Sequence, residues 1–165
     1  MQFYHYGSTT LKSAYALGSF SIQAEVALLS RNIIINSGED VEWGCTILVT
    51  EFGDYSIGHM ILDNVEIIGC SQSSSDRAAV RIQDTAIEVS QITNSTFVNT
   101  TAWGLLTSSV SSGFIFKHNV IYKTIERAIM VESSSNIHLT DNLIIGTLSS
   151  AASFDICTES DCAGT

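Results

Sequence analysis

A phrase centred on asparagine recurs along the chain at intervals of about 25 residues, a period typical of solenoid repeats. It reads GHMILDNVEI at 58–67, GFIFKHNVIY at 113–122 and NIHLTDNLII at 136–145. Apolar residues alternate on both sides of each asparagine, which is the pattern of strands with one buried face. Asparagine tolerates left-handed backbone, so each phrase predicts two short strands joined at a tight corner. The corner residues are Asn64, Asn94, Asn119 and Asn142, at nearly even spacing.

A further strand-like segment recurs between the asparagine phrases. Its copies are CTILV (45–49), AAVRI (78–82), WGLLT (103–107), RAIMV (127–131) and AASFDI (151–156). Val80, Leu105 and Ile129 hold the same place in three of them and follow nearly the same period as the asparagines. Each repeat is therefore expected to contain a strand, a polar loop, a second strand, an asparagine corner and a third short strand.

An all-strand repeat of this length predicts an all-β fold, namely a right-handed single-stranded parallel β-helix of about five coils. Stacked coils pair their backbones at about 4.8 Å, and the four asparagines are expected to form one hydrogen-bonded column. An antiparallel sandwich also has many short strands but does not explain one asparagine at one phase. We expect a lead-in or cap at 1–23, β-helix repeats at 24–156 and a disulfide-closed tail at 157–165.

The charge balance restricts the partners that the chain can bind. Its 165 residues include 7 Lys and Arg against 17 Asp and Glu, a net charge of −10. Nucleic acids and anionic membranes both need a basic surface, so neither is an expected partner. No apolar run approaches the roughly 20 residues of a membrane span, and no insertion by this segment is expected. The N-terminus does not resemble a signal peptide, which indicates a mature or trimmed product or a piece of a longer chain.

The four cysteines favour disulfides and an oxidising compartment, because their number is even and the chain is rich in Ser, Thr and Asn. Cys157 and Cys162 bracket a short loop, TESD, that one bridge can close. Cys45 and Cys70 are separated by about the length of one repeat. Four reduced, buried thiols are the alternative. We therefore expect an extracellular or cell-surface location with disulfides.

Residues 24–36, AEVALLSRNIIIN, resemble the segment that follows the G8 domain in the fibrocystin-like family. The matching residues are Ala24, Glu25, Val26, Leu28, Leu29, Arg31, Asn32 and Ile33. LDNVEI at 62–67 resembles the next coil of that family, so the resemblance covers the region from about 20 to 70. It implies a region of extracellular parallel β-helix repeats. The hyaluronan-degrading members are much larger than this chain, so the resemblance implies fold and compartment more than activity.

The acidic and basic residues show no arrangement typical of polysaccharide-degrading enzymes. Glycoside hydrolysis needs two carboxyls roughly 5–10 Å apart. Asp63 and Asp141 precede corner asparagines but are separated by two coils, and Asp84 stands elsewhere in its repeat. Arg81 and Arg127 occupy comparable strands without other catalytic groups around them. We therefore assign no catalytic residue.

Metal-binding groups are equally sparse. His5, His59, His118 and His138 fall at different phases of the repeat and do not form a ligand set. Calcium is the metal that the acidic loops GEDVE (38–42) and TESD (158–161) favour, yet neither has an EF-hand or nonapeptide pattern. No cofactor other than this weak calcium option is expected.

Two sequons for asparagine-linked glycans are present, Asn94-Ser95-Thr96 and Asn99-Thr100-Thr101. Asn94 falls at the corner phase, where the predicted column occupies its amide. Asn99 falls shortly after it, in an expected exposed loop. We predict that Asn99 carries the glycan if the chain is secreted.

These observations favour a non-catalytic structural or adhesive module of a secreted or cell-surface glycoprotein. Solenoid ends expose unpaired strands, and no capping helix is evident, so flanking sequence or a second copy is the expected partner. Stacking of copies end to end would give filaments. One alternative is a carbohydrate-binding or carbohydrate-degrading domain, and another is a calcium-stabilised adhesive domain. Aromatic residues that could stack on sugars in the first alternative are Trp43, Tyr55, Trp103 and Tyr122.

Overall fold

The computed structural model describes residues 8–12, 19–23, 27–38, 44–53 and 57–155. Every regular element in these residues is a β-strand, as the alternating apolar pattern predicts. The strands are β1 Ser8–Lys12, β2 Ser19–Gln23, β3 Ile33–Asn36, β4 Ile47–Thr50, β5 Ile61–Asp63, β6 Val65–Ile68, β7 Val80–Gln83, β8 Ser90–Thr93, β9 Thr96–Thr100, β10 Leu105–Ser108, β11 Phe114–Lys117, β12 Val120–Thr124, β13 Ile129–Glu132, β14 Ile137–Thr140, β15 Leu143–Thr147 and β16 Ala152–Asp155.

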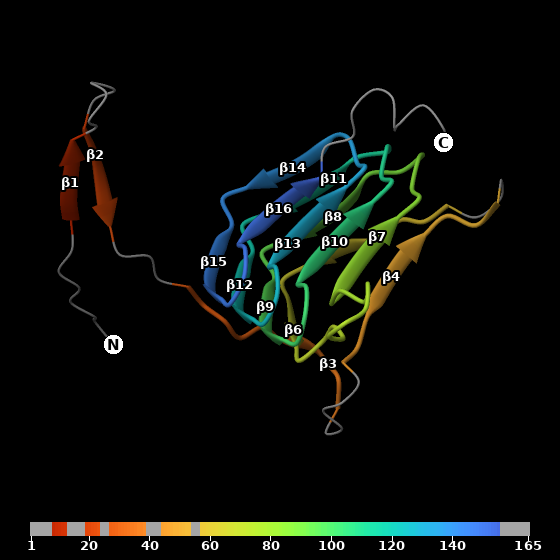
Figure 1. Ribbon diagram of the computed structural model, residues 1–165, viewed down its shortest axis with the longest axis horizontal. Coiled ribbons are helices and arrows are strands. Elements are labelled where there is room, and N and C mark those ends of the chain that lie inside the picture. The colour runs from red at the N-terminus through yellow and green to blue at the C-terminus, as the bar shows by residue number, and fades with distance from the viewer. Residues whose placement is uncertain (1–7, 13–18, 24–26, 39–43, 54–56, 156–165) are drawn as a thin grey trace.

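Fourteen of these strands form three parallel sheets (Figure 1). Sheet I has the order β15-β12-β9-β6-β3, sheet II the order β16-β13-β10-β7-β4, and sheet III the order β14-β11-β8-β5. The chain visits the sheets in the fixed rotation I, II, III, so successive groups of three strands form repeats 1 to 5, the last of which has strands in sheets I and II only. β1 and β2 pair antiparallel with each other.

Strand register follows the periodicity of the sequence. Val80 lies opposite Leu105, and Leu105 lies opposite Ile129, so the predicted alignment of these three residues in sheet II is confirmed. In sheet I, Thr96 pairs with Val120, and this pairing sets the local length of the repeat. The all-β class and the parallel stacking are thus as predicted.

The core lies between the three sheets and is built from alternate residues of each strand. Phe97, Phe114 and Phe116 are fully buried, and the ring centroids of Phe97 and Phe116 are 5.7 Å apart. The aliphatic side chains around them occupy equivalent places in successive repeats, such as Val80 in repeat 2 and Leu105 in repeat 3. Stacking like on like allows a chain of short strands to bury a continuous apolar interior.

A smaller apolar cluster covers the outer face of sheet II. It contains Ala78, Leu106 and Met130, with the partly buried Trp103 packed against them. The indole of Trp103 therefore has a packing role on the sheet. This placement weakens the prediction that Trp103 stacks on a bound sugar.

The corner between sheets III and I uses left-handed backbone in every repeat, as predicted, but the corner residues differ from the expected four. Asn64, Asn94, His118 and Asp141 have φ of 58°, 50°, 56° and 50°. The expected single asparagine column is therefore divided into two. The reason is register: because Thr96 pairs with Val120 in sheet I, residue 118 and not residue 119 is equivalent to Asn94.

Asn119 and Asn142 lie one position beyond the corner and form a hydrogen-bonded ladder along the stack. The backbone N–H of Ser95 donates to Oδ1 of Asn119 at 2.8 Å, and the backbone N–H of Asn119 donates to Oδ1 of Asn142 at 2.9 Å. The ladder continues to repeat 2, where the backbone N–H of Val65 donates to Ser95 Oγ at 3.1 Å. The corner polar groups thus join neighbouring repeats.

Candidate functional site

A column of residues with left-handed backbone lies near the ends of the sheet I strands. Asn99, Lys123 and Gly146 fall between paired residues of β9, β12 and β15, and their φ values are 53°, 59° and 72°. The register is the same before and after these residues, so the three left-handed positions lie one above another in neighbouring strands. Gly146 adopts this conformation at no steric cost, and asparagine is among the side chains that tolerate it best.

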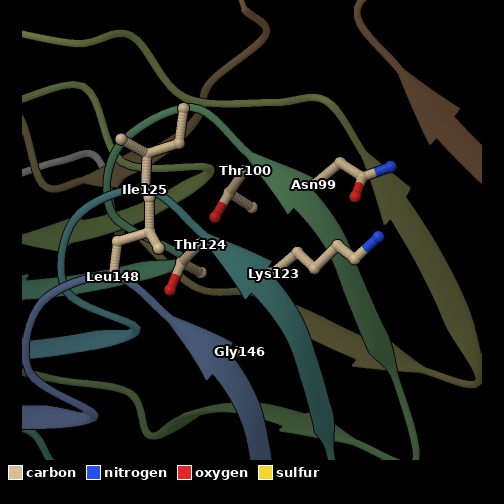
Figure 2. A pocket seen from close by; sticks show the side chains of 7 residues that line it. All are labelled: Asn99, Thr100, Lys123, Thr124, Ile125, Gly146 and Leu148. Atoms are coloured by element: carbon tan, nitrogen blue, oxygen red, sulfur yellow. The ribbon is translucent and has the colours of Figure 1, made fainter.

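A pocket of about 460 Å³ opens beside this column (Figure 2). Figure 2 shows Thr100 and Thr124 between two groups of side chains. Asn99 and Lys123 lie on one side of them, and Ile125 and Leu148 lie on the other. The pocket is lined by Asn99, Thr100, Lys123, Thr124, Ile125, Gly146 and Leu148. Residues of repeats 3, 4 and 5 thus meet at one place on the surface.

The pocket wall is mainly apolar, and its apolar side chains are exposed. Leu148 and Ile125 are 80 % and 53 % exposed. The hydroxyl oxygens of Thr100 and Thr124 are buried and have no hydrogen-bond partner among the described residues. Gly146 contributes no side chain to the pocket wall. A Cβ at this position would lie 3.6 Å from Lys123 Cγ, in ordinary van der Waals contact. Exposed aliphatic side chains around a hollow are typical of a surface that contacts another molecule.

Lys123 is the charged residue that lines the pocket. Its Nζ atom lies 5.1 Å from the ring centroid of Tyr122, within the range of a cation–π contact. No Asp or Glu belongs to the lining residues that the structure describes. The pocket is therefore suited to a neutral or anionic group that has an apolar face and hydrogen-bond acceptors.

The two sequons are placed differently by the fold. Asn99 lies within β9 and not in the expected loop, but it is exposed on the pocket rim, and none of the described residues hydrogen-bonds to its side-chain amide. Asn94 is exposed as well, but its Nδ2 donates to Asp63 Oδ1 at 2.8 Å, and its carbonyl oxygen accepts from Arg31 Nε at 2.8 Å. The preference for Asn99 stays a prediction, with a geometric reason added to it.

A disulfide joins Cys45 and Cys70, whose Cα atoms are 4.3 Å apart. It links the segment that leads into β4 to the segment that follows β6, and thus joins repeats 1 and 2. Cys157 and Cys162 lie outside the described residues, as do the second acidic loop (158–161) and residues 39–42 of the first. The pairing of Cys45 with Cys70 resolves the alternatives that the sequence left open for these two thiols.

The carboxylates that are candidates for catalysis lie apart. Asp63 and Asp141 belong to repeats 1 and 4 at the corner of sheets III and I, and Asp84 follows β7 of sheet II. Hydrogen bonds donated by Thr93 at 2.6 Å and by Asn94 lower the pKa of Asp63 below its usual range. These contacts keep the Asp63 carboxyl ionised and engaged, which is the state of a structural carboxylate.

The histidines that the structure describes are also dispersed. His118 Nε2 lies 3.2 Å from Asp141 Oδ2, an exposed pair of adjacent corner residues. His59 Nε2 lies 3.1 Å from the carbonyl oxygen of Val89, and His138 is on β14. Within the described ranges no group of three or more His, Cys, Asp or Glu side chains is placed to hold a metal ion. His5 lies outside those ranges.

Of the aromatic candidates, the two that the structure describes do not form a platform. Tyr122 lies opposite Val98 and Ile145 on sheet I, whereas Trp103 packs on the outer face of sheet II. Trp43 and Tyr55 lie outside the described residues.

Sequence reasoning missed Lys123, Ile125 and Leu148 as pocket residues, since only the three-dimensional register brings them together. The one available signal was Gly146, an isolated glycine inside a strand pattern. Such a glycine indicates unusual backbone, and Gly146 has the left-handed conformation beside which this pocket opens.

The segment that carries the family resemblance contacts the outside of the stack. The backbone N–H of Arg31 donates to Glu66 Oε2 at 3.2 Å, and its Nε donates to the carbonyl of Asn94. Arg31 belongs to the first resembling segment and Glu66 to the second, LDNVEI. The two segments on which the resemblance depends are therefore in direct contact, although Ala24, Glu25 and Val26 lie outside the described residues.

Within the part of the chain that the structure describes, both ends of the stack of sheets are open. At one end β3, β4 and β5 pair on one side only, and at the other end β15, β16 and β14 do the same.

The comparisons provide no relative: no family profile, curated protein or solved structure matches the chain. The described residues hold no helix of the length and apolarity needed to cross a bilayer.

Proposed function

We propose that the chain is a non-catalytic structural module of an extracellular or cell-surface protein. In this proposal the three sheets are the faces of a right-handed parallel β-helix of about five coils, similar to the repeats of the fibrocystin-like family. The module extends by stacking with a second copy. The observation that carries the proposal is that, among the described residues, all three sheets end on both sides in strands that are paired on one side only, and that the inward residues Ile33 and Phe154 on those strands are exposed.

The first end offers an apolar surface that continues the core. Ile33 lies opposite the buried Val65 in the inward row of sheet I, yet it is 58 % exposed. Ile35 on the same strand packs against the core and remains only partly covered. A repeat placed before repeat 1 would bury both side chains and pair the free edges of β3, β4 and β5.

The last repeat offers the matching surface. Phe154 lies opposite Val131, and its row continues through Thr107 to Ile82, all three of which are buried. Phe154 itself is 57 % exposed because no strand follows it among the described residues. An aromatic side chain directed toward the interior row at an open edge is a surface that another repeat can cover.

The geometry favours a second copy as the partner. All pairs in the three sheets are parallel, so the strands at the two ends run in the same direction. A copy moved along the stack by its own length therefore presents β3 and β4 to β15 and β16, and β5 to β14. Such a head-to-tail contact does not close on itself and propagates as a filament. Unpaired edges of this kind associate readily unless they are protected.

The extracellular part of the proposal is supported by three features. The disulfide between Cys45 and Cys70 is typical of oxidising compartments. Asn99 is the exposed acceptor of a sequon. The Arg31 contact to Glu66 joins the segments that resemble the extracellular family. The carbohydrate-binding alternative has less support, because the aromatic residues that the structure describes form no common face.

Edge-strand variants test the stacking. Ile33→Lys places a charge in the inward row of the free edge, whereas Ile34→Lys places it on the outer row of the same strand, at a position of similar exposure (54 %). The matched pair at the other end is Phe154→Lys and Ser153→Lys. We expect light scattering and electron microscopy to show rods that lengthen with concentration for the natural chain, Ile34→Lys and Ser153→Lys.

Ile33→Lys and Phe154→Lys should remain monomeric in the same experiments, because an inward-pointing charge blocks edge pairing. Unchanged circular dichroism would establish that each variant is folded. A natural chain that stays monomeric at millimolar concentration would disprove self-stacking. Equal assembly by the inward and outward variants would show that any rods form through another surface.

A further inference from the structure

We propose that the pocket beside Asn99 seats the first N-acetylglucosamine of a glycan linked to Asn99 Nδ2. The inference depends on the proposed extracellular location, since the sugar is added in the secretory pathway. It goes further by assigning a modification site and the surface of the protein that holds the modification. The pocket then stabilises the stack through a covalently attached ligand.

The acceptor is favourably placed. Asn99 is exposed, its amide is free of hydrogen bonds from the described residues, and its positive φ of 53° lifts it out of the strand pairing. The side-chain amide of Asn94 is not free, because its Nδ2 donates a hydrogen bond to Asp63. The stack engages the other residues of both sequons, since Ser95, Thr96 and Thr100 are buried and Thr101 Oγ1 donates to the Ser71 carbonyl, so the two sites differ at the asparagine side chain. Folding therefore leaves Asn99 accessible and occupies Asn94.

The attachment is an ordinary group transfer. A separate transferase would move an oligosaccharide from a lipid diphosphate donor to the Asn99 amide. The bond between Nδ2 and sugar C1 forms, and the bond between C1 and the diphosphate oxygen breaks. The diphosphate leaves with the electron pair, and Nδ2 gives up one proton to the base of the transferase. The chain itself supplies only the acceptor and the surface around it.

The pocket matches the chemistry of an N-acetylated sugar. Its volume of about 460 Å³ is within the range of roughly 300–1,000 Å³ for small-molecule sites. Ile125 and Leu148 offer exposed aliphatic surface for the C–H face of the ring and the acetamido methyl group. The Lys123 ammonium, on the same side of the pocket as Asn99, can donate to a sugar hydroxyl or to the acetamido carbonyl (Figure 2).

The occupant is thus determined by position as well as by chemistry. A sugar attached to Asn99 begins at the rim of the pocket, so it reaches the exposed Leu148 and Ile125 without the entropy cost of binding from solution. Asn99 is in repeat 3, while the apolar side chains are in repeats 4 and 5. A seated sugar would therefore bridge three successive repeats and resist their separation.

The test compares two enzymatic trims of the same glycoprotein. The full chain is secreted from a eukaryotic host with Thr96→Val, which removes the Asn94 sequon and replaces a buried hydroxyl that has no hydrogen-bond partner among the described residues. An endoglycosidase leaves one N-acetylglucosamine on Asn99, whereas an amidase removes the whole glycan and converts Asn99 to Asp. Glycopeptide mass spectrometry verifies both products.

We expect the form with one sugar to melt about 2–4 °C higher than the sugar-free form, the shift of a modest stabilisation in a domain of this size. Combined Ile125→Ser and Leu148→Ser should abolish the difference, because they remove the apolar wall. Ile145→Ser is the matched control, since it is exposed on the same sheet but does not line the pocket. This control should retain the difference.

Two results would overturn the inference. One is secreted chain with no hexosamine on Asn99, and the other is a glycosylated chain whose two trimmed forms melt at the same temperature. Neither depends on stacking of copies, which is measured on unglycosylated chain with the Ile33 and Ile34 variants. Failure of the sugar seat and failure of the proposed assembly are therefore separately visible.

Discussion

Asn119→Ala is the substitution that most directly tests the ladder between repeats. Asn119 is 1 % exposed, its Oδ1 accepts from the Ser95 N–H at 2.8 Å, and its Nδ2 donates to the Ile92 carbonyl at 2.9 Å. Alanine removes both hydrogen bonds and leaves a buried donor and a buried acceptor without partners. Each such group costs roughly 1–3 kcal/mol, so we expect a loss of about 4 kcal/mol in the free energy of unfolding.

Two other variants make the expectation specific. Asn142→Ala removes the same kind of contact, from the Asn119 N–H at 2.9 Å and to the Phe116 carbonyl at 2.7 Å, at a partly exposed position. Water can replace those bonds in part, so its cost should be smaller. Asn32→Ala is the neutral control, because Asn32 is exposed and its side chain makes no hydrogen bond to any described residue.

The assay is urea unfolding followed by circular dichroism, with thermal melts as a second measure. A loss of about 4 kcal/mol corresponds to roughly 8–16 °C in the melting temperature of a domain of this size. A loss for Asn119→Ala below about 1 kcal/mol, or one equal to that of Asn32→Ala, would refute the ladder argument. It would mean that water or a shifted backbone satisfies the two groups at little cost.

Three further predictions concern the disulfide, a close contact and a carboxylate. Replacing Cys45 and Cys70 by Ser should cost about 3 kcal/mol in urea unfolding, because the bridge closes a loop with a sequence separation of 25; an unchanged midpoint would show that the bridge adds no stability. Gly104→Ala should cost about 1–3 kcal/mol, since a Cβ there would lie 2.7 Å from the Ala128 carbonyl oxygen of the next repeat; stability equal to the natural chain would show that the repeats can move apart freely. Hydrogen bonds hold the pKa of Asp63 below the usual 3.8, so its stabilising effect is present above that pH and is lost as the pH falls through the lowered pKa of the folded state. Urea unfolding of the natural chain and of Asp63→Asn is compared from mildly acidic pH down to the pH range in which Asp63 is protonated. The free energy of unfolding of the natural chain should fall relative to that of Asp63→Asn over this range. Parallel pH profiles of the two proteins would contradict the prediction.

The periodicity of the sequence predicted the register of the repeats at some positions and not at others. Alignment of Val80, Leu105 and Ile129 was correct, because apolar residues in strands must share one face. Alignment of Asn94 with Asn119 was one position off. Both residues are compatible with a corner, and only backbone pairing distinguishes the left-handed position from the inward position next to it.

The candidate site shows the same division at the level of single residues. Asn99 could be singled out because the sequon is a local motif. Lys123, Ile125, Gly146 and Leu148 could not, because they are separated from Asn99 by one and two repeats. A shift of one position in register would turn Lys123 to the other face of β12 and displace Ile125 and Leu148, which directly follow β12 and β15.

The sequence by itself determined the all-β class, the repeat length and the acidic, cysteine-bearing character of the chain. These properties depend on composition and on apolar periodicity, which act locally along the backbone. Tertiary structure alone decided which corner residues adopt left-handed backbone, which thiols pair and where a pocket opens. Those features arise from the stacking of neighbouring repeats, and each depends on contacts between residues a full repeat apart in the sequence.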